Sequence, residues 1–174
     1  MTLETANDRV LTPGRALAYG ASAIGVIDFL YPTLFALANG RPWYRPWQSV
    51  ASAVLGPSAG TGGYASALLG VFLHFAVATC VMSVYLIASR WLPVLRQRTL
   101  LCGLAFGLIA FFVMNRVVVP LTLIGRHPLV WTTFNVGGLL VHIFLLGPAA
   151  AYFAGRTAGR ADRENEKDRS PAVS

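Results

Sequence analysis

Charged residues are scarce in this sequence. Asp, Glu, Lys and Arg make up 12% of the 174 residues, whereas 55% are hydrophobic. Soluble globular domains carry about 25% charged residues, roughly twice that share. The scarcity of charge argues against an ordinary soluble domain and indicates an integral membrane protein.

Cysteines and catalytic motifs are also few. The two cysteines, Cys80 and Cys102, both lie in apolar runs and form no CxxC pair, so we expect neither a disulfide nor a metal centre. No phosphate-binding loop, HExxH helix or pair of carboxylates is present. The sequence therefore predicts no catalytic residue, no metal ligand and no bound cofactor, and it argues against an enzyme.

Four apolar runs are long enough to cross a bilayer as helices, which takes about 20 residues. The alternation of polar and apolar residues that is typical of a membrane β-barrel is absent from all four. We predict an all-α membrane four-helix bundle in residues 1–155, followed by a charged cytoplasmic tail without fixed structure in 156–174. The predicted spans are residues 16–38, 66–89, 99–124 and 132–155.

The net charge of +7 reflects topology rather than nucleic-acid binding. If both termini are cytoplasmic, three basic residues lie outside the membrane: Arg41, Arg45 and Arg126. Ten lie inside: Arg9, Arg15, Arg90, Arg96, Arg98, Arg156, Arg160, Arg163, Lys167 and Arg169. Basic residues favour the cytoplasmic side, so this asymmetry predicts a multi-pass protein with both termini in the cytoplasm. Anionic lipids are the expected partners of these residues, and no nucleic acid is.

The first outer loop contains a doubled Arg-Pro-Trp tripeptide, which ends at Trp43 and again at Trp47. After it, apolar residues recur at helical spacing opposite Gln48, which predicts a short helix lying on the outer leaflet. A re-entrant segment is the alternative for this loop. Tryptophans gather at lipid headgroups, so we expect four interfacial anchors: Trp43, Trp47, Trp91 and Trp131.

The third span contains Arg116, a charge that hydrocarbon does not tolerate alone. An arginine near the middle of a span costs about 2.5–3.5 kcal/mol on insertion scales, so it usually faces the bundle interior and finds a partner. Among the acidic residues, Asp28 alone lies inside an apolar run. The sequence therefore predicts an Asp28–Arg116 ion pair around which the helices assemble.

An internal repeat suggests which residues accompany this pair. Asp28-x-x-x-Pro32 matches Arg116-x-x-x-Pro120, and the segment Gly70 to His74 matches Gly138 to His142. Matched segments would run in the same direction through the membrane, as in parallel repeats. We predict a buried polar core made of Asp28, His74, Asn115, Arg116, Asn135 and His142. In span three, Gly103 and Gly107 predict a close contact with another helix.

Three functions are compatible with these features. The first is a membrane scaffold, acting as a homo-oligomer or as a subunit of another membrane protein. The second is proton-linked or pH-responsive work, since histidine titrates near neutral pH beside a carboxylate. The third is a b-type haem held by His74 and His142, each four residues after a glycine that would leave room for the macrocycle.

Several short segments resemble a widespread family of uncharacterised bacterial four-span inner-membrane proteins. They are Gly-Val-Ile-Asp28, Gln48-Ser-Val-Ala-Ser, Gly70 to His74, Val113-Met114-Asn115, Val118-Val119-Pro120 and Val141-His142. The layout is also distantly similar to YagU-type proteins. The resemblance implies four helices in a bacterial inner membrane and, through the YagU type, a link to acid tolerance. In that family the position of Arg116 is often apolar, which implies that Asp28 and the histidines are the shared polar residues.

Overall fold

Four long helices form the part of the protein that the structure describes, as the sequence predicts. The computed structural model describes residues 10–126 and 128–157. The helices that are long and apolar enough to span a membrane are Pro13–Ala38, Gly63–Trp91, Thr99–Leu121 and Thr133–Gly155. The first two are the continuous helices α2 (Pro13–Ala38) and α4 (Gly63–Trp91). The described part of the chain contains no strand, and the fold is all-α.

The third and fourth spans each contain a widened π-helical turn. Span three consists of α6 (Thr99–Val113), the π segment η2 (Met114–Val118) and the short turn η3 (Val119–Leu121). Span four consists of α7 (Thr133–Val141), the π segment η4 (His142–Leu146) and α8 (Gly147–Gly155).

A proline follows each π segment at the same offset, Pro120 after η2 and Pro148 after η4. Proline lacks an N–H group, and its ring clashes with the carbonyl four residues earlier. In both cases that carbonyl lies inside the π segment, so a local widening is an expected response.

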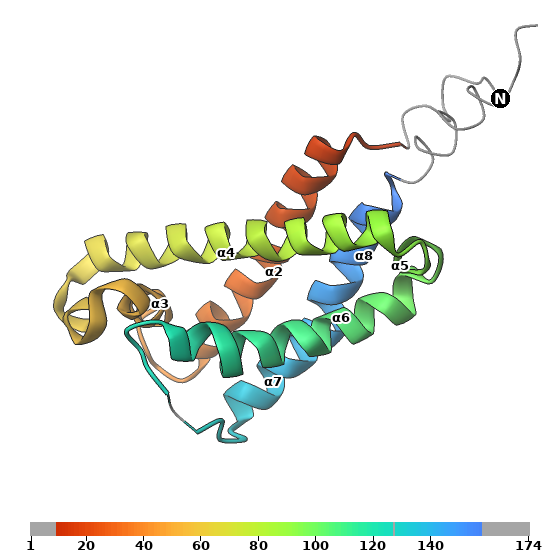
Figure 1. Cartoon of the computed structure of the whole chain (residues 1–174). Helices are drawn as coiled ribbons and strands as arrows, with labels where there is room; N and C mark the ends of the chain where they lie inside the picture. The colour runs from red at the N-terminus through yellow and green to blue at the C-terminus, as the bar shows by residue number, and fades with distance from the viewer. Residues whose placement is uncertain (1–9, 127, 158–174) are drawn as a thin grey trace, which may run out of the picture.

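The helices pack as two antiparallel pairs, α2 with α4 and α6 with α8, and the pairs join through α2 and α8. In Figure 1, α4 and α6 leave the connecting helix α5 (Val94–Gln97) and diverge toward their far ends. If the two halves were structural repeats, span one would correspond to span three and span two to span four. Helix α4 would then pack on α6 in the way that α2 packs on α8. Among the described residues α4 and α6 make no comparable contact, so the two halves are not equivalent in packing.

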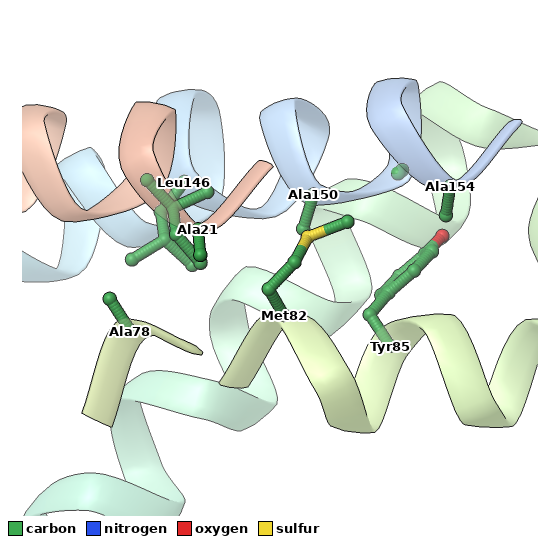
Figure 2. Close-up of a cluster of buried hydrophobic side chains, with 9 residues drawn as sticks. Ala21, Ala78, Met82, Tyr85, Leu146, Ala150 and Ala154 are labelled. Carbon is green, nitrogen blue, oxygen red and sulfur yellow. The ribbon is translucent and has the colours of Figure 1, made fainter. Parts of the chain in front are cut away.

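Small side chains line the place where α2, α4 and α8 cross. The buried cluster consists of Ala21, Ile24, Ala78, Met82, Tyr85, Leu146, Ala150, Ala151 and Ala154. Figure 2 shows Met82 and Tyr85 rising from α4 toward the alanines of the other two helices. Alanines let helix backbones approach closely, which is how helices associate where lipid removes the hydrophobic drive.

Glycines mark the closest helix contacts. A Cβ atom at Gly107 would overlap the carbonyl oxygen of His142, and one at Gly103 would come within 2.8 Å of Pro148. These contacts confirm that the small-residue face of span three is a helix-packing surface, and they identify span four as its partner. Gly70 has the same role in α4, where a Cβ would overlap the backbone of Trp47.

The predicted loop helix is α3 (Arg45–Leu55). It packs on α4, and the amide of Leu123 donates to the carbonyl of Ala53 at 3.0 Å. In Figure 1 it lies at the end of the bundle where α4 and α6 have diverged. The buried face of α3 includes a polar residue as well as apolar ones. Trp47 and Gln48 are its buried residues together with Ala51, whereas Val54 and Leu55 are exposed.

Both ends of the described chain lie at the opposite end of the bundle, beside α5. The amide of Leu11 donates to the carbonyl of Arg156 at 3.0 Å, and α5 contacts α8 (Figure 1). This arrangement follows from an even number of spans. The predicted unstructured tail, residues 156–174, lies outside the described residues except for 156 and 157.

Candidate functional site

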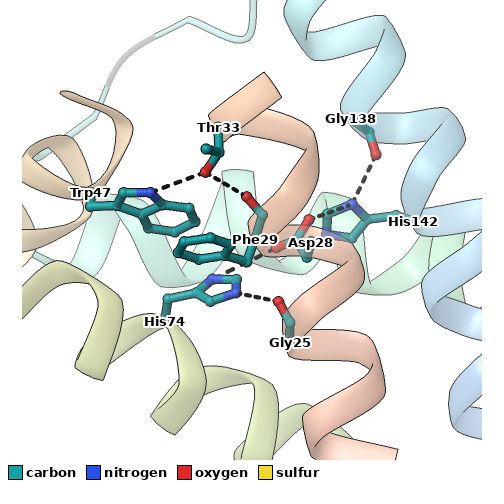
Figure 3. A network of polar contacts seen from close by, with 8 residues as sticks. All are labelled: Gly25, Asp28, Phe29, Thr33, Trp47, His74, Gly138 and His142. Carbon is teal, nitrogen blue, oxygen red and sulfur yellow. Dashed lines mark hydrogen bonds and ion pairs between the residues drawn. The ribbon is translucent and has the colours of Figure 1, made fainter. Parts of the chain in front are cut away.

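Three titratable side chains from three different spans meet at one point. Asp28 of α2 lies between two imidazoles: its Oδ2 is 3.9 Å from His74 Nδ1, and its Oδ1 is 3.8 Å from His142 Nδ1. Figure 3 shows the carboxyl group with His74 of α4 on one side and His142 of η4 on the other. We refer to Asp28, His74 and His142 as the His–Asp–His cluster.

Backbone carbonyls fix both imidazole rings. His74 Nε2 lies 2.9 Å from the carbonyl oxygen of Gly25, and His142 Nδ1 lies 2.8 Å from that of Gly138. A carbonyl oxygen only accepts, so each of these ring nitrogens must donate and carry a hydrogen. The two bonds determine which nitrogen of each neutral ring is protonated.

The tautomer of His74 affects its contact with the carboxyl group of Asp28. Because Nε2 of His74 carries the hydrogen, Nδ1 of a neutral His74 presents a lone pair toward Asp28. An ionised carboxylate and a lone pair repel each other. One proton, on either Asp28 or His74, turns the contact into an attraction and leaves the pair with no net charge.

Aromatic side chains enclose His74. The Trp47 ring stacks on Phe29 with centroids 4.3 Å apart, and it meets His74 edge-on at 5.0 Å. Trp47 Nε1 donates to Thr33 Oγ1 at 3.2 Å, so α3 is attached to α2 beside the cluster (Figure 3). Trp47 is 1% exposed, and its prediction as a membrane-interface anchor was wrong because it packs inside the protein. Trp43, Trp91 and Trp131 are exposed.

Sequence reasoning missed the contribution of Trp47 and Thr33 to the site. One signal was present: Gly70 precedes His74 by one helical turn, and a glycine there marks a close approach. The identity of the approaching segment could not be deduced, because the amphipathic pattern of α3 predicts a helix but does not indicate which span it packs on.

The predicted Asp28–Arg116 ion pair does not form. Asp28 faces the two histidines, whereas Arg116 is exposed and lines a separate pocket with Arg126. The physical reason is position. Arg116 lies five residues before the end of span three at Leu121, about 7–8 Å at 1.5 Å per residue. Its long side chain extends to the surface instead of the bundle interior.

The two predicted asparagines also lie apart from the cluster. Asn115 Nδ2 donates to the carbonyl of Phe111 within its own helix at 2.9 Å. Asn135 Nδ2 donates to the carbonyl of Val130 at 2.6 Å, at the start of α7. Both amides satisfy nearby backbone, so the predicted polar core of six residues reduces to three that meet.

The cluster is partly open rather than buried. The side chains of His74 and His142 are 11% and 14% exposed, and that of Asp28 is 29% exposed. Among the described residues, the buried polar side chains are Gln48, Ser66 and Ser89, and none is charged. The three residues of the predicted buried polar core that meet are therefore only partly buried.

The geometry does not favour a haem between the histidines. Asp28 occupies the space between the rings, and a macrocycle would have to displace it together with α2. The glycines expected to leave room are also covered, Gly70 by Trp47 and Gly138 by Phe111 and Tyr31. Within the described residues, no group of three His, Cys, Asp or Glu side chains is placed to hold a metal ion.

Comparisons of the chain with family models, with curated proteins and with solved structures find no match. The fold and the site together define a class, a four-helix protein with helices apolar enough to span a membrane and with a His–Asp–His cluster joining three of them.

Proposed function

We propose that this protein is a pH-responsive protein of the bacterial inner membrane in which proton binding at the His–Asp–His cluster controls how α2, α4 and span four fit together. The observation that carries the proposal is the carboxyl group of Asp28 within 4 Å of two histidines from two other spans. Histidine is the side chain whose charge changes near neutral pH.

The contacts favour a local switch over a path for protons across the membrane. Within the described chain, hydrogen bonds from the two imidazoles end on the backbone carbonyls of Gly25 and Gly138. A relay would need further side chains in sequence toward each face. Tyr31 bonds to the carbonyl of Phe134 at 2.7 Å and does not extend the cluster.

The contact between Asp28 and His74 depends on the number of protons that the pair holds. With one proton the pair carries no net charge, whereas without it a carboxylate faces a lone pair among apolar side chains, which is unfavourable. Binding or loss of a proton should therefore change how α2, α4 and span four fit together.

The test is thermal unfolding of detergent-purified protein across a pH series. We expect the unfolding midpoint of the wild type to change across the pH range in which histidine titrates, and this dependence to be lost in Asp28→Asn, whose neutral amide is nearly isosteric. Arg41→Gln is the control, since it removes an exposed charge outside the cluster. Equal pH profiles for wild type and Asp28→Asn would contradict the proposal.

The competing function is a membrane scaffold or partner subunit, in a homo-oligomer or with another membrane protein. One observation favours it: 11% of the most apolar window of span three is buried, against 22% in each of the other spans. Two measurements distinguish the pH switch, the proton relay and the scaffold: proton flux in liposomes and the pH profile of thermal unfolding. Flux lost in Asp28→Asn and His74→Gln indicates a relay, whereas no flux and no cluster-dependent pH profile leaves the scaffold.

We also propose which end of the bundle faces the cytoplasm. Among the described residues, the end of the bundle beside α5 carries Arg15, Arg90, Arg96, Arg98 and Arg156, whereas the α3 end carries Arg41, Arg45 and Arg126. The first end should face the cytoplasm, because basic residues favour that side. Cysteine labelling from outside the cell at a residue introduced in α3 and at another in α5 tests this.

A further inference from the structure

A pocket at the far end of span three contains two arginines and no acidic residue. Its volume is about 370 Å³, and it is lined by Asn115, Arg116, Val117, Pro120, Leu121 and Arg126. Arg116 comes from the π segment η2, and Arg126 comes from the loop that follows the span. No hydrogen bond or ion pair occupies either guanidinium group within the described chain, and two like charges beside one pocket repel each other.

From this arrangement we infer that the pocket binds the anionic phosphate group of a membrane lipid. Guanidinium groups form paired hydrogen bonds with phosphate oxygens, and an anion between two arginines removes their repulsion. Asn115 adds polar surface to the same pocket.

The apolar side of the pocket selects a lipid over free phosphate. Leu121 is 82% exposed and Val117 is 50% exposed, and both line the pocket beside the arginines. An amphiphile satisfies both surfaces at once, with its phosphate on the arginines and its acyl chain along the leucine and valine. The depth also fits, because Arg116 lies one to two turns from the end of the span, where lipid headgroups lie.

This site is independent of the His–Asp–His cluster. Arg116 and Arg126 line the pocket and form no ion pair with Asp28. The ion-pair contacts of Asp28 are with His74 and His142. Variants of the two arginines therefore test the pocket without changing the cluster.

The experiment measures lipid binding to detergent-purified protein by native mass spectrometry, with phosphatidylglycerol and phosphatidylcholine as probes. We expect the wild type to bind phosphatidylglycerol about tenfold more tightly than phosphatidylcholine, since the choline cation of the latter offsets its phosphate. The Arg116→Gln/Arg126→Gln variant should lose that preference, because it removes two charge-assisted contacts. Arg41→Gln, an exposed arginine outside the pocket, should retain it.

Two further variants keep the test decisive if the double variant is unstable. Arg116→Lys/Arg126→Lys retains both charges and should keep part of the preference while losing the paired geometry. Val117→Phe retains both arginines and fills the pocket, so it should weaken binding about as much as the charge-removing variant.

Three results would overturn the inference. Equal binding of the two lipids by the wild type would remove the anion preference. An equal loss in Arg41→Gln would show general attraction by surface charge. Competition by inorganic phosphate at the same concentration as phosphatidylglycerol would show that the ligand is free phosphate and that the apolar side of the pocket contributes nothing.

Discussion

Asp28 and Arg116 are both charged residues within apolar helices, and the protein accommodates them in different ways. Asp28 lies ten residues before the end of α2 at Ala38, about 15 Å along the helix axis, and its side chain is short. Arg116 lies five residues before the end of its span and has a long side chain. The first has partners inside the bundle, and the second extends to a pocket at the surface.

The difference shows that depth and reach decide whether a charge in a span needs a partner. An aspartate at mid-depth cannot extend to water, so two other helices must bring polar groups to it. An arginine within two turns of the helix end can extend its charge outward along its aliphatic stem. The same sequence signal, a charge in an apolar run, therefore has two structural meanings.

The largest effect should come from removing both partners of Asp28. We expect His74→Leu/His142→Leu to lower the free energy of unfolding by about 2–3 kcal/mol, because it leaves the carboxyl group of Asp28 without polar partners. Chemical or thermal unfolding in detergent measures this loss. Adding Asp28→Leu to the double variant should restore much of it, since no charge then remains. Failure of that rescue would show that the histidines stabilise the bundle by packing alone.

The second effect concerns how span three positions the cluster. Gly107→Ala should destabilise the protein strongly, by about 1–3 kcal/mol, because its Cβ would overlap the backbone carbonyl of His142. Gly138→Ala is the matched control, since its Cβ meets side chains at an ordinary 3.7 Å. Thermal unfolding compares the two variants. If Gly107→Ala destabilised the protein no more than Gly138→Ala does, α6 and η4 would be able to separate at little cost in free energy.

Helix number and boundaries could be predicted from the sequence because lipid demands about 20 apolar residues per span. The depth of Arg116 in the membrane was harder to predict. The predicted third span continues to residue 124, whereas the helix ends at Leu121. Those three residues made Arg116 look deeper than it is. The position of Trp47 was beyond reach for another reason: its contacts with Phe29 and His74 are long-range and depend on the crossing of α3 over Gly70.

The internal repeat in the sequence did not predict equivalent structural surroundings for the two matched segments either. Asp28-x-x-x-Pro32 and Arg116-x-x-x-Pro120 share spacing, yet Pro32 lies inside a continuous α-helix while Pro120 follows a π segment. Helix partners decide the outcome, and they differ between the two halves. A shared spacing of residues over five positions does not fix their tertiary surroundings.

A smaller effect should come from the contact that joins α2 to span four near the cluster. Tyr31→Phe removes the hydroxyl that donates to the carbonyl of Phe134 at 2.7 Å, and it should cost about 0.5–1.5 kcal/mol. The ring contact with Phe134 remains, with centroids 5.5 Å apart. The pH profile of unfolding should keep its wild-type shape, since Tyr31 bonds to backbone and to no member of the cluster. A changed shape would indicate that the tyrosine takes part in proton binding.

The smallest effect should come from Arg116→Gln. Because Arg116 is exposed and forms no ion pair with Asp28, its loss should change the free energy of unfolding by less than about 0.5 kcal/mol in lipid-free detergent. The measurement is thermal unfolding beside Arg41→Gln, which removes the same charge from the loop between α2 and α3. If Arg116→Gln instead destabilised the protein as much as the double histidine variant, the two charges would depend on each other. Depth and side-chain length would then not explain why one needs internal partners and the other does not.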